Sequence, residues 1–334
     1  MSNHLRVISI FGVILSALTL SVSAAEPTAT QTVTNSGRFG TNGFRRSVVR
    51  FQKTEVKYAH GPDSERKDGV PRGKITEFDW TNSTVFPGTI RHCSIYVPAQ
   101  YDASKPAALM VFQDGHTYQK EDGDFRVPIV FDNLIAAKEM PVTIAVFIDP
   151  GFKRTEFPTA PRGWQPEPQN RSFEYDSLTT NYSQFLLSEI LPHIRKQYSI
   201  TDDPEGRAIG GISSGAICAW TVAWHRPDQF RKVVSHVGSF TNIRGGDKYP
   251  EIIRTNDWRP IRMFVQDGAN DLRGSPQNRR PGWNWVVANH NLAAALEEND
   301  YDYNYVFGEG GHNGNQGGTI FPDTMRWLWR DYLK

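Results

Sequence analysis

Residues 207–216 read Arg-Ala-Ile-Gly-Gly-Ile-Ser-Ser-Gly-Ala, and they contain the pattern Gly-x-Ser-x-Gly centred on Ser213. An apolar run precedes the pattern, and an Ala-rich apolar run that favours a helix follows it. This layout is typical of a sharp turn between a strand and a helix, with the serine at its apex. Gly211 and Gly215 fit such a turn, because a Cβ at either position would strike the neighbouring backbone. We therefore expect Ser213 to be a nucleophile and the N–H of Ser214 to donate to an oxyanion.

Short apolar segments and helix-like segments alternate along the rest of the chain. Strands that alternate with helices predict an α/β fold with a mostly parallel sheet and helices on both faces. No internal repeat or boundary divides residues 71–334, so we expect one catalytic domain there. The expected strands are 73–80, 89–97, 107–113, 142–148, 207–210, 232–236, 261–266 and 301–307, and the expected helices include 182–198, 285–298 and 322–333.

Two later segments supply the base and the acid that an activated serine needs. The strand at 261–266 is followed by an acidic loop, and the strand at 301–307 is followed by a Gly-rich loop that contains His312. The chain order of serine, acid and histidine is that of the α/β-hydrolases. His312 is the candidate base, because His290, the other histidine beyond the acidic loop, falls inside a helix-like segment.

The acidic loop offers two candidate acids, Asp267 and Asp271. Asp267 directly ends the expected strand, whereas Asp271 lies in the loop beyond it, which is better placed to reach under a histidine. We favour Asp271 as the acid and keep Asp267 as the alternative. Whichever carboxylate is not the acid is expected to order the loop through Asx-type hydrogen bonds.

A second oxyanion donor is expected from the loop after the strand at 107–113, because sites in such sheets form beyond the carboxyl ends of the strands. This loop reads Asp114-Gly115-His116. The backbone N–H of His116 or of Gly115 is the candidate, and Asp114 is expected to hold the loop.

The N-terminus predicts export. Residues 1–6 are short and basic, residues 7–20 are apolar without charge, and small residues follow up to Ala25, a pattern typical of a cleaved signal peptide. Residues 26–70 are polar and are expected to be an arm or linker. The mature protein is expected to be secreted or periplasmic, without stable membrane association.

Charge and cysteine content give no indication of a nucleic-acid or metal partner. The chain has 37 Lys and Arg against 36 Asp and Glu, so its balance gives no argument for binding nucleic acid. Its two cysteines, Cys93 and Cys218, are expected to be buried small residues, with a disulfide as the alternative. No Cys and His spacing predicts a metal site.

The chain resembles the Putative esterase family, which includes esterase D, enterochelin esterases, feruloyl and acetyl-xylan esterases and mycolyltransferases. The resemblance runs from about residue 90 to the C-terminus. It implies an α/β-hydrolase fold and a serine hydrolase without a cofactor, in which Ser213 is the nucleophile, Asp271 the acid, His312 the base and His116 the oxyanion donor. The segments that carry it are 95–101, 113–115, 170–175, 185–192, the turn at Ser213, and 308–312.

The substrate is expected to be a small-molecule or carbohydrate ester, with acetyl or feruloyl as the acyl group. A siderophore ester, acyl transfer and a non-catalytic carbohydrate-binding relative are the alternatives. The sequence does not predict the oligomeric state. The candidate substrate-binding residues, taken from aromatic positions near the loops and from the segment 170–175, are Trp164, Arg171, Glu174, Trp283 and Trp285.

Overall fold

The protein is described by a computed structural model, which defines residues 57–159, 167–274 and 282–332. The predicted signal peptide and Trp164 lie outside these described residues. The compact unit that carries the strands and helices runs from Val56 to the C-terminus.

A mixed sheet forms the centre of this unit, in the order β1-β2-β4-β3-β5-β6-β7-β8. The pairs β1–β2 and β2–β4 are antiparallel, and every later pair in the order is parallel. The expected mostly parallel sheet is therefore confirmed. The strands are β1 Lys74–Trp80, β2 Arg91–Val97, β3 Ala108–Gln113, β4 Thr143–Ile148, β5 Arg207–Ile212, β6 Lys232–His236, β7 Arg262–Asn270 and β8 Asp302–Gly311.

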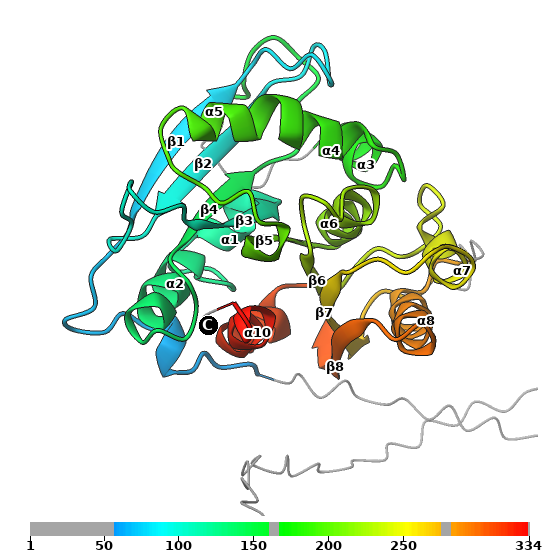
Figure 1. Ribbon diagram of the computed structural model, residues 1–334. Helices are drawn as coiled ribbons and strands as arrows, with labels where there is room; N and C mark the ends of the chain where they lie inside the picture. Colours follow the sequence, from blue (N-terminus) through cyan, green and yellow to red (C-terminus); the bar gives the residue numbers. More distant parts are fainter. Residues whose placement is uncertain (1–56, 160–166, 275–281, 333–334) are drawn as a thin grey trace, which may run out of the picture. The chain divides into compact units, whose positions relative to one another are not determined.

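Helices cover both faces of the sheet, because its central strands are apolar on both sides (Figure 1). Leu109 and Val111 belong to the apolar layer that includes α6 and α8, whereas Met110 and Phe112 belong to the layer that includes α2 and α10. This alternation predicts two separate apolar layers, and the core divides in that way. The helices are α1 Gly115–Gln119, α2 Val127–Ala136, α3 Pro168–Tyr175, α4 Asn181–Phe185, α5 Leu191–Arg195, α6 Ser214–His225, α7 Tyr249–Thr255, α8 Trp285–Glu298, α9 Asn315–Thr319 and α10 Phe321–Trp329.

Two features of the elements differ from the sequence-based expectation. The helix expected over 182–198 is divided into α4, a π-helical turn at Leu186–Ile190 and α5, with Pro192 just inside α5. A proline lacks the N–H that a continuous α-helix needs. The strands β7 and β8 run further than expected, so that Asp271 and His312 each directly follow a strand.

The arm expected over residues 26–70 is corrected at its end. Between Asp63 and Arg66 the described chain packs on α2, where a guanidinium nitrogen of Arg66 lies 2.5 Å from a carboxylate oxygen of Asp132. The Asn133 side chain donates to the carbonyls of Asp63 and Glu65 over 2.9 Å. These polar contacts join residues far apart in the chain, so local composition did not reveal them.

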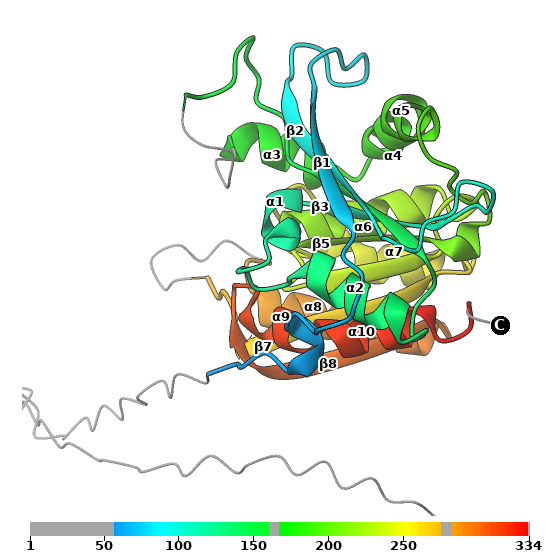
Figure 2. The same cartoon turned by 90° about the vertical axis from the view of Figure 1, so that its left-hand side faces the viewer.

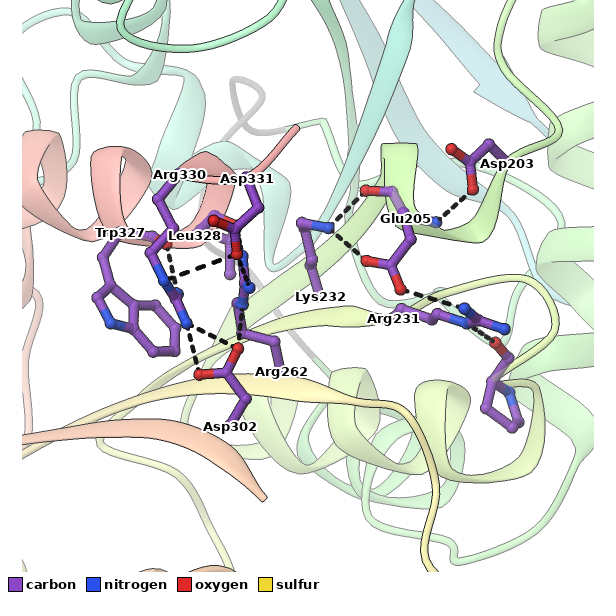
Figure 3. A network of polar contacts seen from close by, with 11 residues as sticks. Asp203, Glu205, Arg231, Lys232, Arg262, Asp302, Trp327, Leu328, Arg330 and Asp331 are labelled. Atoms are coloured by element: carbon purple, nitrogen blue, oxygen red, sulfur yellow. Dashed lines mark hydrogen bonds and ion pairs between the residues drawn. The ribbon is translucent and has the colours of Figure 1, made fainter. Parts of the chain in front are cut away.

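The carboxyl ends of the parallel strands gather the loops that concern function. In Figure 2, α1, α3 and α9 lie at the same left-hand side of the unit. The opposite ends of β6 to β8 carry a network of paired charges instead (Figure 3). Lys232 donates to the carbonyl and carboxylate of Glu205, and Arg262 pairs with Asp302 and Asp331. Arg262 also donates to the carbonyl of Leu328, so this network supports the C-terminal helix.

Cys93 and Cys218 are both buried, as expected for small core residues, and no disulfide joins them. Burial raises the pKa of the Cys218 thiol well above its ordinary value, so it remains protonated and unreactive. Within the described residues, no helix has the length and apolar character to cross a bilayer.

Candidate active site

Ser213 occupies a strained turn between β5 and α6. Its backbone angles are φ 57° and ψ −119°, outside the regions that residues with a Cβ prefer. Such a conformation costs about 1–3 kcal/mol and persists only where its surroundings enforce it. A Cβ on Gly211 would overlap the backbone of Gly215, so the close approach that the sequence predicted is present. The backbone of Ser213 is held by the carbonyl of His236 over 2.9 Å and by the N–H of Ser239 over 3.0 Å.

His312 bridges Ser213 and Asp271. Its Nε2 lies 2.8 Å from Oγ of Ser213, and its Nδ1 lies 2.6 Å from Oδ1 of Asp271. The three side chains come from positions 99 and 41 residues apart in the chain. With Nδ1 protonated, the ring donates to Asp271 and Nε2 is free to accept the serine proton. The arrangement can therefore remove a proton from Ser213 and hold it on an oriented imidazole.

Asp271 is buried, with 4 % of its surface exposed. Burial alone would raise its pKa, but hydrogen bonds from His312 and Asp267 hold the pKa below its ordinary value. The N–H of Leu272 also donates to Oδ1 of Asp271 over 2.5 Å. Asp271 is thus kept ionised beside the ring that it orients.

Asp267 lies within β7 and is wholly buried beside Asp271. Burial, followed by the proximity of Asp271, raises the pKa of Asp267 to about 9. In the described structure Oδ2 of Asp271 has no hydrogen-bond donor other than Asp267. A proton on Asp267 supplies this donor, because the acid can then donate to the neighbouring carboxylate. Asp267 therefore acts on Asp271, and the backbone N–H of Gly268 also bonds to it, so its expected role in ordering the loop stays a prediction.

The oxyanion prediction for His116 is corrected. The backbone N–H of His116 donates to Oδ1 of Asp149 over 3.0 Å, and its ring Nδ1 lies 2.6 Å from the same oxygen. The side chain lines a cavity of about 110 Å³ beside β2 and β4, together with His92 and Gln119. The N–H of His116 is therefore already hydrogen-bonded, and Gly115 as the oxyanion donor stays a prediction.

Arg171 holds the loop that carries Gly115. Its Nε donates to Oδ1 of Asp114 over 2.9 Å and its Nη2 to Oδ2 over 2.6 Å, a bidentate pair in which Asp114 is wholly buried. Asp114 has a left-handed backbone, with φ 55°, and its carboxylate reaches the space beside Gly215 at the start of α6. Arg171 was expected to bind substrate, but its fork is engaged by Asp114. It braces the loop of Asp114 and Gly115 against the serine turn.

Glu174 was also expected to bind substrate, and the structure corrects this prediction. Its side chain is fully buried and forms a bidentate pair with Arg91, at 2.7 and 3.0 Å. The N–H of Gly151 and the amide of Asn170 donate to the same carboxylate. The group is a structural ion pair beneath α3, and the sequence pattern around it could not reveal the distant Arg91.

The two described tryptophans among the candidates differ in exposure. Trp283 is partly exposed, and its indole N–H donates to the carbonyl of Asn242 over 3.1 Å. Trp285 is 5 % exposed, and its ring packs edge-on against His312 at 5.4 Å between centroids. Trp285 therefore packs against the histidine ring and is too buried to line an open site.

Sequence reasoning missed Ser239, whose Oγ lies 3.0 Å from Oγ of Ser213. The signal was its place just after β6, since residues that follow strands in such sheets reach the site.

In the described ranges, no cluster of three or more His, Cys, Asp or Glu side chains is arranged to hold a metal ion.

Comparison with known proteins places this geometry in a family. The model of the family described as Putative esterase matches residues 84–318. The chain is 19 % identical over 186 residues to the uncharacterized protein YbbA of Bacillus subtilis (strain 168), which covers 55 % of this chain and 70 % of that protein.

Solved structures share the fold. The enterobactin esterase FES of Shigella flexneri, determined with enterobactin, matches 88 % of this chain and 67 % of its own, with a TM-score of 0.62 and 19 % identity. The ferulic acid esterase AmCE1/Fae1A of Anaeromyces mucronatus matches 82 % of this chain and 97 % of its own, with a TM-score of 0.60 and 19 % identity. At these identities the likeness is one of fold, whereas the family match covers most of the chain. The chain has the α/β-hydrolase fold and belongs to the Putative esterase family.

Proposed function

We propose that this protein is an exported serine esterase that hydrolyses carboxylic esters through Ser213, His312 and Asp271. The observation that carries the proposal is the placement of His312, whose two ring nitrogens lie 2.8 Å from Ser213 Oγ and 2.6 Å from Asp271 Oδ1. A strained serine turn beside this pair adds to it, because the strain has no structural benefit of its own.

In the first half-reaction, His312 Nε2 takes the hydroxyl proton of Ser213 while Oγ attacks the ester carbonyl carbon. The carbonyl π electrons move to oxygen, and the N–H groups of Ser214 and Gly115 stabilise the charge. The intermediate collapses, the bond to the alcohol oxygen breaks, and His312 returns the proton to the departing alcohol. Asp271 stabilises the imidazolium throughout.

The second half-reaction releases the acyl group. His312 removes a proton from water as the water oxygen attacks the acyl carbon, and a second oxyanion forms in the same place. Collapse of this intermediate breaks the bond to Ser213 Oγ, which takes the proton back from His312. The products are the carboxylic acid and the free enzyme. Acyl transfer would follow if an alcohol entered in place of water.

A tryptophan pair beside His312 supports an aromatic acyl group such as feruloyl. Trp283, which is partly exposed, packs edge-on against Trp285, and Trp285 packs against His312. A partly exposed ring near a nucleophile suits a planar acyl group. The fold likeness to a ferulic acid esterase agrees with this choice.

The test compares turnover of methyl ferulate and p-nitrophenyl acetate by the mature protein with that of Ser213→Ala and His312→Ala. Each variant is expected to lose at least about 1,000-fold in kcat while retaining the fold. A higher kcat/KM for methyl ferulate supports the aromatic acyl group. Near-normal turnover by Ser213→Ala would overturn the mechanism.

A siderophore ester is the second candidate, and one observation favours it. Arg244 lies over the exposed Phe173 ring, 5.7 Å from its centroid, and donates to Ser172 over 3.1 Å. A cation beside an aromatic ring suits an anionic catecholate. Hydrolysis of enterobactin, but not of methyl ferulate, would select this candidate.

Export is proposed from residues 1–25 of the sequence. Expression in a bacterial host with fractionation tests it directly. N-terminal sequencing of the periplasmic or secreted form is expected to begin after Ala24 or Ala25. Recovery of the full-length chain in the cytoplasm alone would contradict it.

A further inference from the structure

The turn after β6 brings Ser239 beneath the nucleophile at an energetic cost. Val237 has φ 43°, which is a strained conformation for a buried β-branched residue. Its N–H donates to the carbonyl of Gln266 over 2.8 Å. Two residues later the N–H of Ser239 donates to the carbonyl of Ser213 over 3.0 Å. Backbone strain of about 1–3 kcal/mol persists only where the surrounding structure enforces it, and here the strained turn positions Ser239.

The hydroxyl of Ser239 connects two groups of the site. Its Oγ lies 3.0 Å from Oγ of Ser213 and 3.0 Å from Nε1 of Trp285. Ser239 is 1 % exposed, so bulk water does not satisfy its hydroxyl. The amide of Asn289 on α8 donates to the carbonyls of Gly238 and Trp285, which fixes this turn against the helix.

Donor and acceptor chemistry sets the direction of these hydrogen bonds from Trp285 to His312. An indole N–H only donates, so Ser239 Oγ accepts from Trp285 and keeps its own proton. If Ser213 donated to Ser239, Nε2 of His312 would lack a donor and the buried Ser239 proton would lack an acceptor. In the opposite direction every group is satisfied, with Ser239 donating to Ser213 and Ser213 to His312.

We propose that Ser239 is a further catalytic residue, which donates a hydrogen bond from its hydroxyl to Oγ of Ser213 and is itself oriented by the indole N–H of Trp285. The inference rests on the proposed function, in which Ser213 is the nucleophile. Trp285 is a positioning residue, because it acts on the reacting oxygen only through Ser239.

The hydrogen bond from Ser239 strengthens as charge develops on the serine oxygen. When His312 removes the Ser213 proton, Oγ becomes more negative, and a bond to a charged acceptor is about twice as strong as a neutral one. Ser239 keeps its proton throughout, so the proton balance between Ser213 and His312 is unchanged. When the acyl group is released, the same bond stabilises the departing Oγ before His312 returns its proton. A contact that is stronger in the transition state than in the ground state raises kcat.

The test measures kcat and KM for p-nitrophenyl acetate in three variants of the mature protein. Ser239→Ala is expected to lower kcat about 10–100-fold, the worth of a hydrogen bond to a developing charge, with KM within about 2-fold. Trp285→Phe keeps a ring against His312 and removes the donor, and is expected to lower kcat about 3–10-fold. Ser235→Ala is the matched control, because Ser235 is equally buried at the end of β6 and its hydroxyl has no partner in the described structure. The kcat of Ser235→Ala is expected to stay within about 2-fold of the wild-type value, because Ser235 shares no partner with the reacting groups.

The double variant shows whether Trp285 and Ser239 act through one series of hydrogen bonds or contribute to kcat independently. If Trp285 acts through Ser239, then Ser239→Ala with Trp285→Phe has about the same kcat as Ser239→Ala alone. Independent multiplicative losses would overturn the positioning role. Melting temperatures accompany each variant. If Ser239→Ala does not fold, Trp285→Phe decides, and an unchanged kcat in that variant overturns the proposal.

The failure of this inference differs from the failure of the proposed function. An active Ser213→Ala variant would overturn the serine mechanism itself. An inactive Ser213→Ala variant combined with a fully active, folded Ser239→Ala variant would overturn only the role of Ser239. An equal loss in Ser235→Ala and Ser239→Ala would assign the effect to packing at the end of β6 and would also overturn it.

Discussion

Gly268 of β7 and Gly310 of β8 bring the ends of these two strands into direct contact. A Cβ on Gly268 would overlap the carbonyl and N–H of Gly310, so the two backbones approach more closely than any other residue would allow at position 268. The contact lies where β7 has an irregular register against β8. It sets the separation between Asp271 and His312, which follow these strands.

Gly268→Ala is therefore expected to move the acid away from the histidine. The overlap involves backbone atoms, which cannot rotate away, so we expect a loss of about 1–3 kcal/mol in stability and at least a tenfold loss in kcat. Gly311→Ala is the control, because its nearest neighbour, the carbonyl of Asn270, would be an ordinary 3.5 Å away. Urea unfolding and ester turnover measure both effects, and equal behaviour of the two variants would contradict the prediction.

The two carboxylates of β7 are expected to respond differently to conversion into amides. Asp271→Asn removes the charge that orients His312 and is expected to lower kcat by about 1,000–10,000-fold. Asp267→Asn keeps a donor toward Asp271, and its kcat is expected to remain within about 5-fold of the wild type. The larger loss in steady-state turnover identifies the acid. A reversed order would make Asp267 the acid.

Asp267 is also expected to make stability depend on pH. Its pKa rises from 3.8 to about 9 in the folded protein, so the folded state binds one more proton than the unfolded state between these values. Its contribution is fully present below the unfolded pKa and falls as pH rises, by about 1.4 kcal/mol per unit. Asp267→Asn lacks this proton, so its stability relative to the wild type rises from pH 5 to pH 8. Urea unfolding at these pH values measures the difference, and a constant difference would argue that Asp267 is ionised.

Arg171 is expected to influence catalysis through the oxyanion loop. Arg171→Lys keeps the charge but loses the bidentate fork on Asp114. The loosened loop is expected to misplace the N–H of Gly115 and to lower kcat about tenfold, with a smaller change in KM. The reverse pattern, a raised KM with normal kcat in steady-state assays, would return Arg171 to a substrate-binding role.

Glu174 is expected to matter for stability and not for substrate. Glu174→Ala leaves the buried Arg91 guanidinium unpaired and is expected to cost about 3–5 kcal/mol. Replacing both partners, as Arg91→Met with Glu174→Leu, is expected to recover most of this loss. Thermal unfolding measures the stability of the single and the double variant. The KM of the folded Glu174→Ala protein is expected to be unchanged. A raised KM without destabilisation would contradict the structural assignment.

The candidate reactive residues could be predicted from the sequence where the residues next to them in the chain determine the local structure. The glycines around Ser213 and the short apolar runs predicted a strand, a sharp turn and a helix, and each depends on neighbours a few residues away. The acid and histidine could be named because they follow strands, and parallel strands end at one edge of a sheet. Their order in the chain limited the choices further.

Roles that depend on a partner distant in the chain were decided only by tertiary structure. His116 donates to Asp149, Glu174 pairs with Arg91, and Ser239 reaches Ser213, each across at least 26 residues. A side chain's role depends on which groups burial leaves within hydrogen-bond distance, and sequence spacing does not encode that distance. The protonation of Asp267 has the same origin, because it arises from removing two nearby carboxylates from water together. The sequence by itself determined the fold class and the candidate reactive residues, and the folded chain decided which groups support them.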